Sequence, residues 1–97
     1  MPYIPQSDRQ KFENILNSLR TILRYENEFK SSEFNFMIST AIADILDEKG
    51  MSYTNGANII GCLECIKLEL YRRVLSPYED QKMKENGDVY ENVDKEP

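Results

Sequence analysis

The chain has 97 residues, of which 40% are hydrophobic and 30% are charged, and its formal net charge is −5 at pH 7. This length fits one domain, and the balance of apolar and charged residues is typical of a folded protein. The acidic excess argues against a nucleic-acid-binding surface, which normally carries a basic excess. No apolar run approaches the roughly 20 residues of a membrane-spanning helix, and the first residues form no hydrophobic signal core. We therefore expect a cytoplasmic protein without nucleic-acid or membrane partners.

The first apolar stripe predicts a helix near the start of the chain. Ser7 is a suitable N-cap, with Gln10 three residues later in a capping-box arrangement. Apolar residues then recur at steps of three and four, the spacing of one helix face: Phe12, Ile15, Leu16, Leu19, Ile22 and Leu23. The polar stretch RYENEFKSS that follows indicates the end of this helix and a loop.

A second helix is predicted from Ser32, its N-cap, to Gly50. Glycine readily adopts the left-handed conformation that ends helices. The apolar residues of this segment fall on one face: Phe34, Met37, Ile38, Ala41, Ile42, Ile45 and Leu46.

The third predicted helix starts near Ser52 or Thr54 and runs to about Leu75. Its apolar residues cover a wide arc, which is typical of a central helix with more than one neighbour. They are Ile59, Ile60, Leu63, Ile66, Leu70, Tyr71 and Val74.

The segment SPYE predicts that a short fourth helix starts directly afterwards. Ser76 as N-cap, Pro77 at the first helical position and Glu79 three residues after the cap form a restart signal. This helix should leave the third at an angle and run to about Glu85, before an Asn-Gly pair that ends it.

Together these elements predict an all-α fold. We expect a small bundle of three main helices, followed by a short fourth helix and an acidic C-terminal tail. Residues 1–86 should form a single helical domain. Residues 87–97 contain four acidic residues and one lysine, so they should form a flexible, solvated tail.

Cys62 and Cys65 have the C-x-x-C spacing of redox dithiols and of half of many zinc sites. A reactive pair has its first thiol at a helix N-terminus, whereas Cys62 is predicted about two turns inside a helix. A closed zinc site needs four ligands, and the chain has two cysteines and no histidine, so two subunits would have to pool their thiolates. We therefore expect small buried thiols that serve in packing, with no metal and no cofactor.

Small residues follow one face of the third predicted helix. Ala57, Gly61 and Cys65 lie at positions i, i+4 and i+8, a spacing that lets another helix approach closely. We call these three residues the seam. Its partner is either the second helix of the same chain or the same helix of a second copy. We expect a homo-oligomer to which the seam contributes.

The chain lacks the residue patterns of common enzymes. The absence of histidine removes the usual acid–base group at neutral pH and the commonest metal ligand. No phosphate-binding loop, dinucleotide fingerprint, nucleophile elbow or calcium loop is present. We therefore expect a non-enzymatic protein.

A polar cluster around the junction of the third and fourth predicted helices is the candidate ligand site. Arginine beside tyrosine can clamp a phosphate or stack on a base. The alternative is that the tyrosines cover the core rim while the arginines pair with Glu69 and Glu79. The candidate residues are Tyr71, Arg72, Arg73, Tyr78 and Lys82, joined by Tyr3 and Arg9 from the N-terminal segment.

Three segments resemble a family of short, uncharacterised phage and bacterial proteins. They are the opening MPYIPQSDRQKF, the middle EFNFMIST and the long end LECIKLELYRRVLSPYEDQKMKENGDVY. The resemblance covers nearly the whole chain and implies that the last seven residues, ENVDKEP, are an additional tail. It implies no established activity, cofactor or catalytic residue.

Two functions from different classes fit these observations. The first is a phage-encoded, counter-defence binding protein that sequesters a host factor or a small phosphorylated nucleotide messenger in the host cytosol. The messenger version rests on analogy with other small helical phage proteins. The second is a protein–protein adaptor or structural component that acts through its helix faces and acidic tail.

Overall fold

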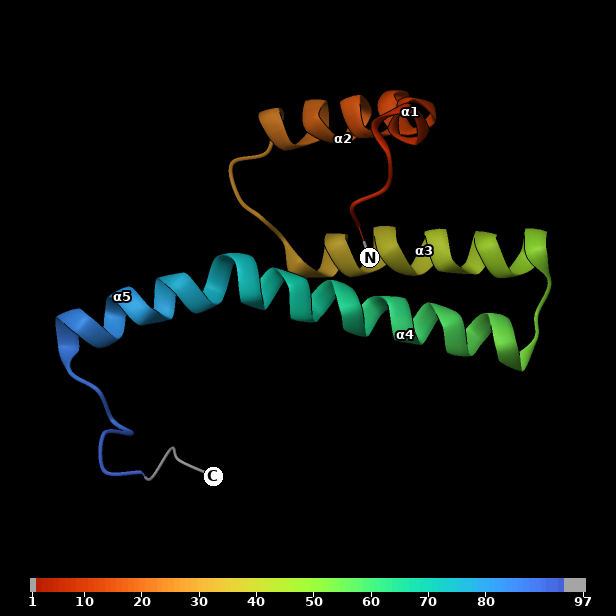
Figure 1. Cartoon of the computed structure of the whole chain (residues 1–97). Helices are drawn as coiled ribbons and strands as arrows, with labels where there is room; N and C mark the ends of the chain where they lie inside the picture. Colours follow the sequence, from red (N-terminus) through yellow and green to blue (C-terminus); the bar gives the residue numbers. More distant parts are fainter. Residues whose placement is uncertain (1, 94–97) are drawn as a thin grey trace. The chain divides into compact units, whose positions relative to one another are not determined.

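The computed structural model describes residues 2–93, and over that range it is all-α without strands (Figure 1). The predicted fold class is thereby confirmed. The chain divides into an N-terminal unit, Met1–Gly61, and a C-terminal unit, Cys62–Pro97. The single domain over residues 1–86 stays a prediction. The helices are α1 (Gln6–Arg9), the 3-10 helix η1 (Gln10–Phe12), α2 (Glu13–Tyr25), α3 (Ser31–Lys49), α4 (Tyr53–Leu70), the π-helix η2 (Tyr71–Leu75) and α5 (Ser76–Asn86).

The first predicted helix is interrupted in the structure. Ser7 lies inside α1, and the cap position belongs to Pro5, so the predicted capping box is wrong. Pro5 has an extended backbone, with φ −54° and ψ 148°, and its carbonyl accepts a hydrogen bond from the Asp8 N–H at 3.0 Å. This turn starts the helix two residues earlier than predicted, at Gln6 where the Ser7 cap implied Asp8. The chain then tightens into η1 before α2 begins.

The start of α3 was also mispredicted, whereas its end was not. Lys30, not Ser32, is the cap residue, and it makes no side-chain cap bond. Its backbone carbonyl accepts the N–H groups of Glu33 and Phe34. At the other end, Gly50 has a φ of 109° and donates its N–H to the Leu46 carbonyl at 2.9 Å. A residue with a Cβ would be strained at this φ, so the predicted role of Gly50 is confirmed.

Two polar side chains fix the turn between α3 and α4. The Ser52 hydroxyl accepts the Asn55 N–H at 3.1 Å, which is the bond of an N-cap. The Asn55 side-chain amide donates back to the Gly50 carbonyl at 2.8 Å. The start of α4 is thereby tied to the end of α3, and the predicted start near Ser52 is confirmed. Figure 1 shows the chain reversing direction at this turn.

No restart occurs at Ser76, so the predicted N-cap is wrong. The Ser76 backbone is helical, with φ −61° and ψ −47°, and its N–H bonds to the Tyr71 carbonyl in a π turn. Proline at position 77 has no N–H for the Arg73 carbonyl, and in a regular α-helix its ring would clash with that carbonyl. The wider π turn relieves this conflict while the backbone stays helical from α4 into α5, where a new helix was expected.

The C-terminal end of α5 agrees with the prediction. Gly87 has a φ of 96° and ends the helix. Local turns follow, in which an Asp88 carboxylate oxygen accepts the Tyr90 N–H at 2.8 Å and the Tyr90 carbonyl accepts the Val93 N–H at 3.0 Å. The predicted flexible tail extends over residues 94–97, which lie outside the described part of the chain.

Apolar side chains remain largely in contact with solvent. Among residues 2–93 none is fully buried, and most large apolar side chains are exposed. The apolar residues that are half-buried all lie in the N-terminal unit, on faces predicted to point inward: Leu19, Ile38, Ile42, Leu46 and Ile59. The periodicity therefore identified the correct faces, but the single chain covers them incompletely. No helix within residues 2–93 is long and apolar enough to cross a membrane.

The two serines give a matched test of the helix caps. Ser52→Ala should lower the free energy of unfolding by about 1 kcal/mol, the usual cost of losing an N-cap bond. Ser76→Ala should change it by less than about 0.5 kcal/mol, because the cap position of α5 belongs to Leu75 and Ser76 lies inside the helix. Urea unfolding followed by circular dichroism measures both values. A larger loss for Ser76→Ala than for Ser52→Ala would contradict the assigned caps.

Candidate functional site

Tyr71, at the start of η2, is held by a carboxylate of α5. Its hydroxyl donates a hydrogen bond to Glu79 at 2.7 Å. In an unbroken α-helix, residues eight apart lie about 80° apart around the axis, because each residue turns the chain by about 100°. The π turn takes up residues with less rotation and so brings the two side chains to the same side. The hydrogen bond to the Glu79 carboxylate, aided by its charge, raises the pKa of Tyr71.

The two arginines of the predicted cluster lie in the same π turn. Arg72 pairs with Glu69 at 2.6 Å, which is the i, i+3 pairing considered in the sequence. Arg73 lies beside it in the sequence and is exposed. Any anion that bound Arg72 would therefore have to displace the Glu69 carboxylate.

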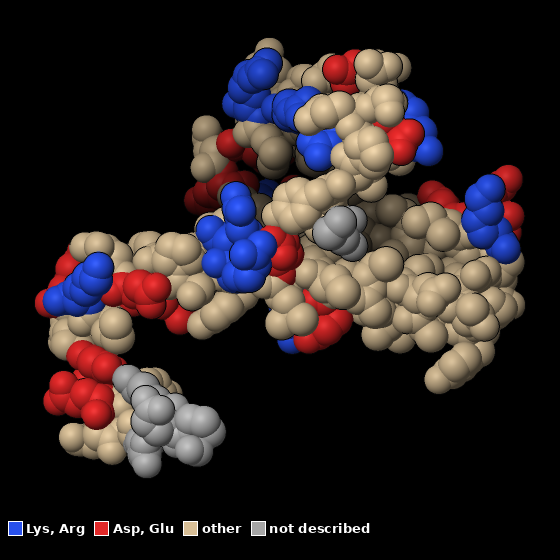
Figure 2. Space-filling view, in the orientation of Figure 1, with Lys and Arg blue, Asp and Glu red and all other residues tan. Residues whose placement is uncertain are grey.

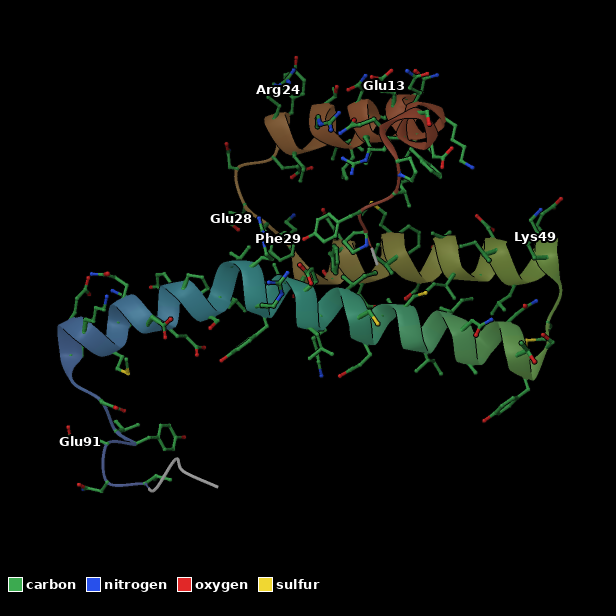
Figure 3. All side chains as sticks on the ribbon, viewed as in Figure 1. Glu13, Arg24, Glu28, Phe29, Lys49 and Glu91 are labelled. Carbon is green, nitrogen blue, oxygen red and sulfur yellow. The ribbon has the colours of Figure 1, made fainter. Side chains whose placement is uncertain are left out.

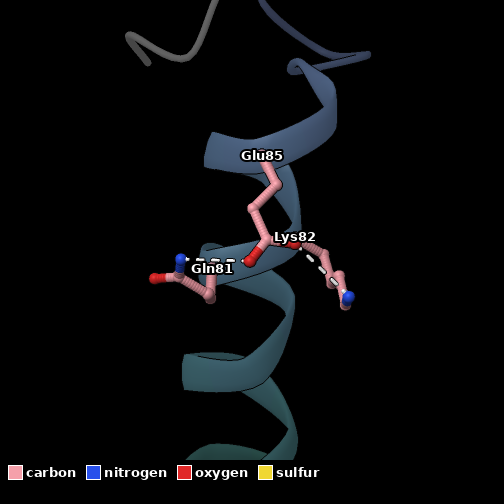
Figure 4. A network of polar contacts seen from close by, with 3 residues as sticks. All are labelled: Gln81, Lys82 and Glu85. Carbon is pink, nitrogen blue, oxygen red and sulfur yellow. Dashed lines mark hydrogen bonds and ion pairs between the residues drawn. The ribbon is translucent and has the colours of Figure 1, made fainter.

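Lys82 and Tyr78 lie together on α5. The Lys82 ammonium is 5.6 Å from the centre of the Tyr78 ring and 3.3 Å from a Glu85 oxygen. The other Glu85 oxygen accepts a hydrogen bond from Gln81 at 3.3 Å, so Glu85 joins both side chains (Figure 4). All of these groups are exposed, and exposed ion pairs of this kind contribute about 0–1 kcal/mol.

The remaining two candidate residues belong to the other unit. Arg9 ends α1, and its Nε donates to the Ile4 carbonyl at 2.9 Å. Tyr3 precedes α1 and is exposed. The structure thus gathers five of the seven candidates in the C-terminal unit and leaves Tyr3 and Arg9 in the N-terminal unit.

The contacts of the cluster favour its structural interpretation. Three of its side chains each interact with a carboxylate of the same unit: Tyr71 with Glu79, Arg72 with Glu69, and Lys82 with Glu85. A phosphate would have to compete with these acidic groups at every one of the three positions. Binding by Arg72 and Arg73 stays a prediction.

The seam residues are accessible in the single chain. A Cβ built on Gly61 would meet no atom of the described residues within 4 Å. Both cysteines are free and exposed, where small buried thiols were expected. Within residues 2–93, no group of three or more potential metal ligands forms a site for a metal ion.

An apolar groove between α2 and α3 is the surface that the sequence did not reveal. Its volume is about 540 Å³, and its lining contains no charged side chain. Figure 3 shows Glu13 and Arg24 on the side of α2 that points away from α3, so the apolar side of α2 faces the groove. The periodicity had identified these residues only as core positions. The lining residues are Asn14, Ile15, Ser18, Leu19, Ile22, Met37, Ile38 and Ala41.

Comparison with known proteins places the chain in one family. Residues 1–89 match the family described as a domain of unknown function (DUF6899), and the chain belongs to this family. The match ends within the segment NGDVY, and so the residues after it are outside the family domain. The search of curated proteins and the search of solved structures found no match.

The Tyr71–Glu79 hydrogen bond makes a prediction about titration. The pKa of Tyr71 is raised above the ordinary tyrosine value of about 10. The neutral hydroxyl and its hydrogen bond to Glu79 should therefore be fully present below pH ~10. They should be lost as the pH rises through the higher pKa of the folded state. Glu79→Gln should bring the Tyr71 pKa back towards its ordinary value, because the carboxylate charge is removed.

Carbon-13 NMR of the tyrosine rings measures this titration. Glu85→Gln is the matched control, since Glu85 accepts its hydrogen bonds from Gln81 and Lys82. A Tyr71 titration that is the same in the wild type and in Glu79→Gln would show that the hydrogen bond does not form in solution.

Proposed function

We propose that the chain is a non-enzymatic binding protein that captures a protein partner, and that the groove between α2 and α3 receives an apolar helix of that partner. The main observation behind this proposal is that the apolar side chains of the groove are exposed to solvent. Ile15 is 68% exposed and Ile22 is 57% exposed, although their spacing places them on an apolar helix face. Contiguous apolar surface of this kind is typical of protein-interaction sites.

The form and chemistry of the groove favour a helix as its occupant. Its two walls are themselves helices, and an amphipathic helix binds such a groove through apolar residues at steps of three and four. The polar groups of the lining are the neutral side chains of Asn14 and Ser18. A charged group placed against the lining would lose its hydration without gaining a partner. The contacting strip of the partner should therefore be apolar and uncharged.

The same observation favours a protein over a phosphorylated messenger as the captured molecule. A phosphate needs cationic or N–H donors, and the groove has no cationic side chain. In the C-terminal unit, Arg72 and Lys82 already pair with carboxylates of the chain. The resemblance to phage proteins supports a host protein as the target, which would make the chain a phage-encoded counter-defence protein. The adaptor function uses the same surface and differs in what the bound partner then does.

Substitution of one groove residue should abolish capture. Ile15→Asp places a carboxylate against the apolar lining, and an unpaired buried charge costs several kcal/mol, so at least tenfold less partner should bind. Arg24→Ala is the matched control, because Arg24 points away from α3 (Figure 3). Each variant is expressed in host cells, purified under native conditions and weighed with its bound molecules by native mass spectrometry.

We expect a partner protein to co-purify in stoichiometric amount with the wild type and with Arg24→Ala. Much less of it should co-purify with Ile15→Asp. Circular dichroism checks that Ile15→Asp keeps its helix content. Stoichiometric nucleotide on the wild type, or undiminished partner on a helical Ile15→Asp, would overturn the proposal.

A further inference from the structure

The start of α4 presents a second apolar surface, separate from the groove. Met51 is 85% exposed, Tyr53 is 92% exposed and Ile60 is 69% exposed. With Ser52, Gly56 and Ala57 they line a hollow of about 590 Å³ within the N-terminal unit. We call the six residues the α4 face. None of them belongs to the lining of the α2–α3 groove.

The charge pattern of the sequence indicates what covers this face. Residues 50–63, GMSYTNGANIIGCL, contain no Asp, Glu, Lys or Arg, and this is the longest uncharged run in a chain that is 30% charged. Figure 2 shows the N-terminal part of α4 without acidic or basic side chains on the visible side. A partner of a different sequence is normally oriented by complementary charges around the contact. The helices that wall the α2–α3 groove carry such charges outside its lining, whereas residues 50–63 carry none.

Two identical chains impose the opposite requirement. In a twofold dimer the same patch meets itself, and a residue near the axis faces its own copy. Any charge there would meet a like charge, which is unfavourable. A chain with a net charge of −5 can therefore pair with itself most readily through an apolar, uncharged face. We infer that a second copy of the chain docks on the α4 face and that the protein forms a twofold dimer with Ala57 near the axis.

The backbone of α4 permits this contact. A Cβ built on Gly56 would meet no atom within 4 Å, so the single chain makes no use of the space beside it. In the dimer, Gly56 and Ala57 let the two helices approach closely, while Ile60, Met51 and Tyr53 pack around the contact. The seam shares Ala57 with the α4 face, whereas Cys65 lies outside the face.

Disulfide trapping tests the position of the axis. In a background of Cys62→Ser and Cys65→Ser, one cysteine is introduced, either Ala57→Cys or Asn58→Cys. Residues 57 and 58 are both exposed but lie about 100° apart around the helix. Under a mild thiol oxidant, Ala57→Cys should form covalent dimers at least tenfold faster than Asn58→Cys. Equal rates for the two variants would overturn the assigned face.

A charged substitution tests the same face without a covalent cross-link. Ile60→Lys places like charges across the axis and should shift the sedimentation coefficient from that of a dimer to that of a monomer. Asn58→Lys is the control that should leave the dimer intact, and circular dichroism confirms that both variants remain helical. A wild-type chain that sediments as a monomer at several hundred micromolar would overturn the inference. Ile15→Asp in the groove should not change dimerisation, so the two proposals fail independently.

Discussion

Apolar side chains are removed from water only where another surface covers them, and each square ångström that is covered contributes about 25 cal/mol. This constraint dominates the present chain. The helices carry clear apolar faces, yet no residue in the range 2–93 is fully buried. A helix of the length of α2, 13 residues, is marginal in water without tertiary packing. We therefore propose that the packing that stabilises these helices comes in part from surfaces outside the single chain.

The two apolar surfaces differ in the partner that each can accept. The groove between α2 and α3 is concave, is walled by two helices and suits an inserted helix. The α4 face surrounds a hollow of about 590 Å³ on one helix and the turn before it, and residues 50–63 carry no charge, which suits contact with an identical copy. The polar cluster around η2 differs from both, because Arg72 and Lys82 are paired with carboxylates of the same unit. This difference is why we place function on the apolar surfaces.

Local signals allowed much of the fold to be predicted from the sequence. Gly50 and Gly87 ended helices because a positive φ is unstrained only for glycine, and Ser52 capped α4 through its own hydroxyl. Ser7 and Ser76 match the same capping pattern but fail, because neighbouring prolines change the backbone. Pro5 starts the first helix early, and Pro77 is accommodated by a π turn. That turn depends on backbone geometry across two helices, which residue spacing does not record.

The candidate site was predictable only in part, for a physical reason. Proximity in sequence correctly placed Tyr71 and Arg72 near one another, and the spacing of Glu69 correctly indicated its pairing with Arg72. The bond from Tyr71 to Glu79 was not predictable, since residues eight apart do not face each other in a regular α-helix. The groove was missed because periodicity identifies an apolar face and does not say what covers it.

Thermal unfolding at different protein concentrations is the most direct test of the central claim. If the α4 face is covered by a second copy of the chain, folding is linked to association, and Tm must rise with protein concentration. Purified chain at two concentrations a hundredfold apart should therefore show a higher Tm at the higher concentration. A cooperative transition with the same Tm at both concentrations would contradict the account, because the chain would then fold without association through the α4 face.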